Sequence, residues 1–192
     1  MINKITVIFL LFTILISAQN NSEATKLPYY ELSENSKEYT AGTVAAKQID
    51  ALGFRFYWAS EGLTEKDLVY KPSDSVRTSM ETVKHIYDLS LIVLNSTLKK
   101  PNSREEKEEM SFLDLRIKTL NNLKQAADIL RKSENIAQYK IIFGTNEIPY
   151  WNNINGPISD AIWHCGQLAT FRRITGNPIN PKINHFSGTV KK

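Results

Sequence analysis

Two side chains that can bind a metal ion lie four residues apart near the C-terminal end of the chain. Asp160 and His164 occur in the segment ISDAIWHCGQLATFRRITGNP (158–178). Residues at positions i and i+4 of an α-helix lie on the same face, one turn apart, so both side chains can reach one ion. Gln167 shares this face and could hydrogen-bond a ligand, with a role in helix packing as the alternative. The pattern D-x-x-x-H is a weak signal that requires a third ligand from elsewhere.

His85 is the candidate for this third ligand. It is one of three histidines in the chain, and it shares a predicted helix face with the apolar residues Leu89 and Ile92. His185 lies in an Asn- and Pro-rich tail and is not included in the predicted site. A histidine on an apolar helix face is more often a hydrogen-bonded core residue than a ligand. However, a buried carboxylate such as Asp160 is costly unless it is paired, and a metal ion would satisfy all three groups together.

Three protein ligands leave at least one coordination position open, which is typical of catalytic rather than structural metal sites. A metal in such a site can lower the pKa of bound water and generate a nucleophile. Two imidazoles and one carboxylate suit zinc, which we take as the default, but also nickel, iron(II) or manganese. The ligand types alone therefore predict a divalent metal without deciding which one.

Four amphipathic helices are expected to position these side chains, because apolar residues recur at spacings of three and four along four segments. Thr78 and Glu81 form a capping-box pattern at the start of the second segment, and Ser111 is a favourable N-cap for the third. Gly176 supplies a left-handed cap at the end of the fourth. The predicted fold is all-α, a four-helix bundle. The predicted helices span approximately residues 41–62, 78–98, 111–132 and 158–176.

The connections between these helices contain turn and strand signals. The segment 64–78 carries a proline and small polar residues, and we expect a loop there. Tyr139–Phe143 is β-prone and a Gly-Thr-Asn turn follows it, so a short β-hairpin is expected before the last helix. Pro149 would limit this hairpin to edge pairing. Pro157 is placed near the first position of the last helix, where proline is well tolerated.

The N-terminal segment matches a secretory signal peptide. Residues 1–18 contain Lys4, then an unbroken apolar run from Ile5 to Ile16 and a small-residue cleavage site. The run is short for a membrane span, although an uncleaved anchor is the alternative. We expect a signal peptide at 1–18, a loosely held lead-in at 19–40, and one domain with a C-terminal tail at 41–192. The predicted location is periplasmic or secreted, with no stable membrane span after cleavage.

Composition excludes several classes of function. A chain of 192 residues with 42% hydrophobic and 23% charged residues is ordinary for one globular domain. The net charge of +4 is spread out, without a basic stripe interleaved with aromatic residues, so nucleic-acid binding is not expected.

Cys165 is the single cysteine, which excludes an internal disulfide, and its apolar neighbours predict burial. Arg172 and Arg173 are interpreted as favourable charges at a helix C-terminus.

Three segments of the chain resemble the DinB/YfiT-like metalloprotein family. They are RFYWASEGL (55–63), ETVKHIYDLS (81–90) and DAIWHCGQLATFRRITGNPINPK (160–182), and the resemblance covers roughly residues 40 to 185. It implies a four-helix bundle with one histidine ligand on the second helix and two, four residues apart, on the last. These positions correspond to His85, Asp160 and His164. Asp160 departs from the family's usual histidine, although aspartate is a competent metal ligand.

The resemblance also implies a range of functions. Characterised members of the family are similar to thiol-dependent transferases and isomerases, but export speaks against a cytosolic thiol as cosubstrate. We therefore expect an exported metal-dependent hydrolase or transferase acting on an unknown small molecule. The alternative is a non-enzymatic bundle that binds a small ligand, or whose polar triad is only structural. Arg55 and Trp58 are further candidates for ligand binding, against core packing or surface pairing. A homodimer is left open.

Overall fold

Polar side chains mark the starts of three long helices in the computed structural model, which describes residues 26–103 and 109–192. Thr40 precedes α1 (Ala41–Ser60), and its hydroxyl accepts a hydrogen bond from the Thr43 amide at 3.2 Å. Thr78 and Glu81 form the predicted capping box before α3 (Ser79–Thr97). Ser111 caps α4 (Phe112–Arg131). These contacts satisfy amide groups that have no partner within the helix.

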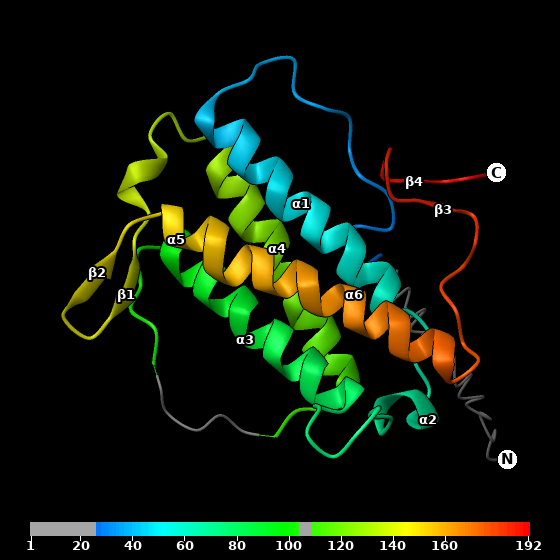
Figure 1. The fold of residues 1–192 in the computed structure, drawn as a ribbon. Coiled ribbons are helices and arrows are strands. Elements are labelled where there is room, and N and C mark those ends of the chain that lie inside the picture. Colours follow the sequence, from blue (N-terminus) through cyan, green and yellow to red (C-terminus); the bar gives the residue numbers. More distant parts are fainter. Residues whose placement is uncertain (1–25, 104–108) are drawn as a thin grey trace, which may run out of the picture.

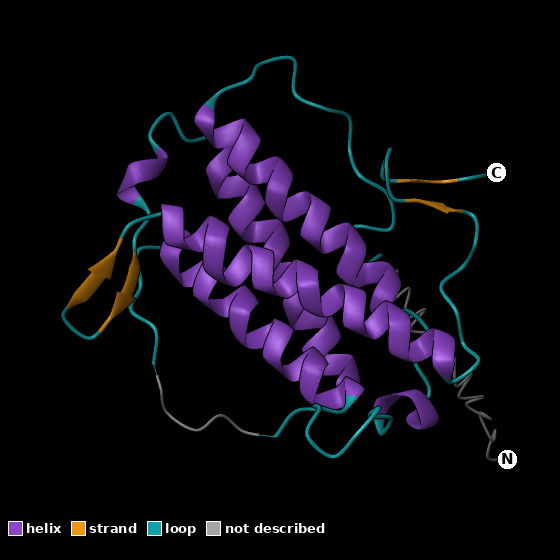
Figure 2. Ribbon diagram, in the orientation of Figure 1, coloured by secondary structure: helices purple, strands orange, loops and turns teal. Residues whose placement is uncertain are grey.

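Four long helices form the body of the fold, the fourth being α6 (Ser159–Ile174). Both α4 and α6 pack against α1 and α3. Figure 1 shows α6 in front, running in nearly the same direction as α1 and α3, with α4 behind. The helices meet through a core of large, fully buried side chains that includes Phe54, Phe56, Ile86, Leu120, Leu123 and Leu168. The chain is therefore mostly helical, as Figure 2 shows.

A short helix occupies part of the segment predicted to be a loop. This helix, α2, spans Glu65–Leu68 and is followed by Val69. Thr64 caps it, since the Thr64 hydroxyl accepts from the Asp67 amide while the Asp67 carboxylate accepts from the Thr64 amide at 2.8 Å. The prediction of a loop throughout 64–78 was wrong because this local capping box outweighs the helix-breaking residues that follow it.

The last helical segment begins earlier than predicted. It starts with α5 (Trp151–Asn153), continues through a π-helical turn at Ile154–Ile158, and passes directly into α6. Pro157 was predicted near the first position of the helix, but it lies inside the π turn. The Ser159 amide donates to the Ile154 carbonyl, five residues back. Proline has no amide proton and clashes with an ordinary α-helical turn, so the wider turn allows the helix to continue past it.

Two short antiparallel hairpins accompany the helices. The predicted hairpin before the last helix is confirmed: β1 (Ile141–Phe143) pairs with β2 (Asn146–Ile148), with Ile141 opposite Ile148. A second hairpin in the C-terminal tail, β3 (Ile183–Asn184) with β4 (Thr189–Val190), was not predicted. A 3₁₀ turn, η1 (Ile136–Gln138), precedes β1.

Part of the N-terminal lead-in packs against the rest of the fold, whereas residues 33–40 are exposed. Tyr29 is buried, and its ring lies so close to Gly53 of α1 that a Cβ atom there would meet it at 2.4 Å. The Leu32 amide donates to the Gly188 carbonyl at 2.8 Å, which joins the lead-in to the C-terminal tail. The predicted signal peptide, 1–18, lies outside the described residues. Within the described part of the chain, the helices are too short or too polar to cross a membrane.

Candidate metal centre

The three predicted metal ligands come together between α3 and α6. The Nε2 atom of His85 lies 3.1 Å from Oδ2 of Asp160, and Nε2 of His164 lies 3.4 Å from Oδ1 of the same carboxylate. One ligand atom from each residue can be chosen so that all three lie within 4.8 Å of one another. The two imidazole rings meet edge to face, with centroids 4.7 Å apart. This group of side chains could hold a metal ion.

Helix geometry explains why these residues meet. His85 lies two turns into α3, and its neighbours Val83 and Ile86 are fully buried, which fixes the orientation of that helix. Asp160 and His164 lie one turn apart in the first half of α6, whose orientation is fixed by the buried Ala161. Because α3 and α6 pack directly against each other, the two helix faces bring the three polar groups into contact.

Exposure differs among the three ligands. The His164 side chain is 12% exposed, the His85 side chain 28% and the Asp160 side chain 39%. The cluster is therefore half-buried, and it opens to solvent mainly on the side of Asp160. In such a position the three side chains can hold an ion while a small molecule still reaches it from solvent.

Gln167 orients His164. The Oε1 atom of Gln167 lies 2.6 Å from Nδ1 of His164. An amide oxygen can only accept, so Nδ1 of the imidazole carries the proton and donates it, which leaves Nε2 with a free lone pair. That Nε2 atom faces Asp160. A hydrogen bond of this kind to the non-ligating nitrogen is the usual support of a histidine metal ligand. The structure thus gives Gln167 a specific contact in the cluster.

The donor set fits a first-row divalent cation. Ligand atoms held tetrahedrally at about 2.0–2.2 Å from zinc lie roughly 3.3–3.6 Å apart. Each imidazole Nε2 lies near this spacing from one carboxylate oxygen, His85 at 3.1 Å from Oδ2 and His164 at 3.4 Å from Oδ1 of Asp160. Because all three ligand atoms lie within 4.8 Å of one another, the remaining adjustment is about 1 Å, within the range of side-chain rotation.

Two cavities adjoin the cluster, one at Asp160 and the other at His164 and Gln167. A groove of about 540 Å³ lies between α3, the β1–β2 hairpin and the π turn, and Asp160 forms part of its wall. A smaller cavity of about 400 Å³ is lined by His164 and Gln167 together with Ser75, Val76 and Arg77 from the loop before α3. The sequence analysis identified neither cavity, because both depend on which segments the fold brings next to the ligands.

Arg55 and Trp58, the other candidate ligand-binding residues, make their contacts elsewhere. The Arg55 guanidinium donates to the Ala51 carbonyl at 3.0 Å within α1. Trp58 is buried, and its indole donates to the Tyr30 carbonyl at 3.1 Å in the N-terminal lead-in. These contacts fit the packing roles that were the alternatives for both residues.

His185 is also placed away from the cluster. Its ring meets that of Phe54 edge to face, with centroids 5.8 Å apart. Burial and, to a lesser degree, the charge of Arg55 lower the pKa of His185 below its ordinary value. This position agrees with the prediction that His185 is not a metal ligand.

The buried state of Cys165 is confirmed. The residue is 3% exposed, and burial raises the pKa of its thiol to about 12. The side chain belongs to the hydrophobic core on a face of α6 different from that of the ligands. A thiol with so high a pKa is a poor nucleophile and a poor metal ligand at neutral pH.

Arg172 has a structural role that the sequence analysis missed. It is 4% exposed, and its guanidinium donates to the carbonyls of Trp58 and Ala59 at the end of α1, at 2.9 and 3.2 Å. It also donates to the carbonyl and side chain of Asn177. Arg172 therefore joins the ends of α1 and α6, a stronger role than interaction with its own helix dipole. Arg173 is exposed, as a surface charge would be.

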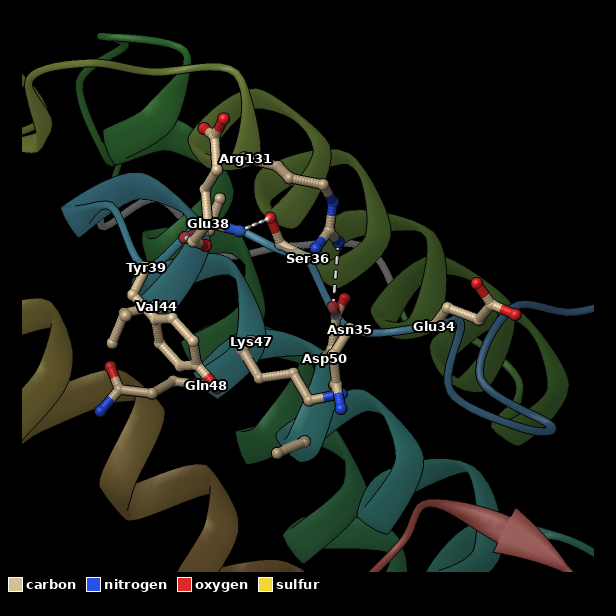
Figure 3. A pocket seen from close by; sticks show the side chains of 12 residues that line it. Glu34, Asn35, Ser36, Glu38, Tyr39, Val44, Lys47, Gln48, Asp50 and Arg131 are labelled. Carbon is tan, nitrogen blue, oxygen red and sulfur yellow. Dashed lines mark hydrogen bonds and ion pairs between the residues drawn. The ribbon is translucent and has the colours of Figure 1, made fainter.

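A third cavity, of about 450 Å³, is lined by residues other than the candidate ligands. Residues 34–39 of the lead-in and the first half of α1 form its walls. Figure 3 shows Asp50 and Arg131 at this cavity, joined by an ion pair of 2.9 Å. No residue of the metal-ligand cluster lines it. It is therefore a separate surface feature and does not extend the candidate centre.

Comparisons of the chain with protein-family models, with characterised proteins and with solved structures found no match. The assignment of function therefore depends on the site itself.

Proposed function

We propose that this chain is an exported, DinB-like four-helix-bundle metalloprotein that acts on a small molecule as a hydrolase or transferase. Its metal ligands would be His85, Asp160 and His164. The single observation that carries the proposal is the meeting of two imidazoles and one carboxylate, from two helices, within 4.8 Å. The packing of α1, α3, α4 and α6 around one core supports the bundle.

Zinc is the metal we propose by default. It accepts nitrogen and oxygen ligands and is commonly held by two histidines and one carboxylate with a further position open. Bound here, zinc would supply Lewis-acid chemistry toward water or a polar group of the substrate. Nickel, iron(II) and manganese accept the same ligand set, so the identity of the metal must come from analysis of the purified protein.

The side chains of the site have distinct roles in this proposal. Asp160 supplies negative charge between the two imidazoles, and it is the most exposed of the three ligands. Gln167 holds His164 in the tautomer whose Nε2 faces the carboxylate. The half-buried position limits access of bulk water, which strengthens electrostatic interactions at the site.

The alternative is a triad that only fixes helix packing or binds a ligand without catalysis. One observation favours it: Asp160 has a hydrogen-bond partner in His85, and Nδ1 of His164 has one in Gln167, so protein atoms alone supply partners to all three residues. A packing triad predicts protein that folds without metal and does not gain stability from it.

Metal analysis of protein purified without a nickel column separates the two proposals. A metalloprotein should carry about one divalent ion per chain, and addition of zinc to stripped protein should raise the melting temperature. His85→Ala and His164→Ala should each abolish both effects, whereas His185→Ala should change neither. Substoichiometric metal with no thermal shift would refute the metal site. Equal loss in all three histidine variants would refute the ligand assignment.

A further inference from the structure

The groove beside Asp160 is apolar over most of its length. It is lined from α3 by Leu89 and Ile92, and from the hairpin by Ile141, Phe143 and Ile148. We call it the hairpin groove. Its volume of about 540 Å³ lies within the range of small-molecule sites. Small-molecule sites are typically concave and lined mainly by apolar side chains with a few polar groups, and the hairpin groove has this character.

The hairpin groove begins at the metal-ligand cluster. Leu89 lies four residues after His85 on α3, so it stands one turn further along the same helix face. On α6, Asp160 is both a candidate ligand and part of the groove wall. A molecule in the groove therefore has one end beside the most exposed of the three ligands.

Trp163 forms the outer wall of the groove on α6. Its side chain lines the groove three residues after Asp160, and the residue is 73% exposed. A tryptophan that leaves water on ligand binding contributes a large apolar area. The π turn at residues 154–158 forms the adjacent wall, and such turns occur frequently at functional sites.

The second cavity beside the cluster has mostly polar and charged residues in its walls, and it exposes far less apolar surface than the hairpin groove. Ser75 and Arg77 line it together with His164 and Gln167, and Val76 is its single apolar residue. The two cavities thus differ in character. An apolar group bound next to the metal would gain most by burial in the hairpin groove, which exposes the larger apolar surface.

We propose that the substrate is a small molecule with a polar, metal-directed group attached to an apolar chain, and that the hairpin groove binds the chain. Trp163 is the residue that sets affinity for this apolar part. This inference rests on the proposed metal site. The inference adds two points to the proposed function: the class of substrate, and its entry from the side of the hairpin groove.

Simple alkyl hydroxamates test the inference, because the hydroxamate group binds zinc and the chain length can be varied. Their affinities for the zinc-loaded protein would be measured by isothermal titration calorimetry. Each methylene that leaves water should tighten binding by about fourfold. Even with incomplete burial, hexanohydroxamate should bind at least about tenfold more tightly than acetohydroxamate.

Trp163→Ala should weaken binding of hexanohydroxamate about fivefold or more while leaving acetohydroxamate unchanged. Trp151→Ala is the matched control, because Trp151 is 76% exposed on α5 and does not line the groove. This control should change neither affinity.

The outcomes distinguish this inference from the proposed function. Binding of zinc and acetohydroxamate without any gain from the longer chain would overturn the groove and leave the metal site intact. The same holds if Trp151→Ala and Trp163→Ala weaken hexanohydroxamate equally. Failure to bind zinc at all would overturn both, and it would be seen before any hydroxamate is added.

Discussion

Replacement of Gln167 by alanine should weaken zinc binding without unfolding the protein. The Gln167 oxygen accepts from Nδ1 of His164 at 2.6 Å, which keeps Nε2 unprotonated and aimed at Asp160. Without this acceptor, the imidazole is free to rotate and to place its proton on the ligating nitrogen. Zinc binding then costs additional free energy, because the His164 imidazole must be reoriented and its proton moved to the other ring nitrogen.

The expected size of the effect follows from this one contact. A neutral hydrogen bond contributes about 0.5–1.5 kcal/mol net, which corresponds to about a 2- to 13-fold change in affinity. Removing a supporting contact to a metal ligand typically costs about 10- to 100-fold. The His164 side chain is 12% exposed, so water can replace the amide only in part. We therefore expect zinc affinity to fall by about tenfold.

Competition with a chromophoric zinc chelator would measure this change. Gln167→Glu keeps an acceptor next to His164 and adds negative charge, so it should bind zinc at least as tightly as the unmodified chain. Gln125→Ala, at an exposed position on α4, is the matched control and should have no effect. The reasoning is refuted if Gln167→Ala binds zinc normally while His164→Ala does not. It is also refuted if Gln167→Glu weakens binding as much as alanine.

Three further predictions concern the rest of the fold. Arg172→Leu should lower the free energy of unfolding, measured by urea denaturation, by about 3 kcal/mol, because it leaves buried carbonyls without donors. The control Arg173→Leu should change this free energy by less than about 0.5 kcal/mol. Burial opposes ionisation of Asp67, but its hydrogen bonds outweigh burial and hold its pKa well below the ordinary value. The folded pKa is thus depressed, so the stability lost in Asp67→Asn should be greatest near neutral pH and should shrink as the pH falls below about 4. Burial raises the pKa of the Cys165 thiol to about 12, so mass spectrometry should find that iodoacetamide labels it slowly in native protein and quickly in denaturant.

The starts of α3 and α4 were predictable because their signals are local. The hydroxyls of Thr78 and Ser111 bond to amides only three residues away, so the sequence contains both partners of each cap. Gly176, predicted as a left-handed cap, has a φ angle of +92°. The same local logic applied to Thr64 and Asp67 would have found α2, whose capping box was overlooked among loop-forming residues.

Features that depend on distant contacts were not predictable in the same way. Pro157 was expected to start a helix, but the hydrogen bonding of the preceding residues lets the helix begin at Trp151 and pass through a π turn. Arg172 was interpreted from its own helix, although its main partners are carbonyls at the end of α1. The site shows both cases: spacing alone placed Asp160 beside His164, whereas the hairpin groove required the folded chain.

The distance along the chain between the candidate ligands has a consequence for kinetics. His85 and Asp160 are 75 residues apart in sequence, and in the fold their side chains are in contact. An ion bound to both would act as a reversible cross-link that closes a long loop, and rupture of α6 from α3 would require the ion to be released. Metal-loaded protein should therefore unfold more slowly than stripped protein and resist proteolysis for longer. In a chain exported unfolded, this cross-link could form only after translocation, so the metal would be acquired from the compartment in which the protein folds.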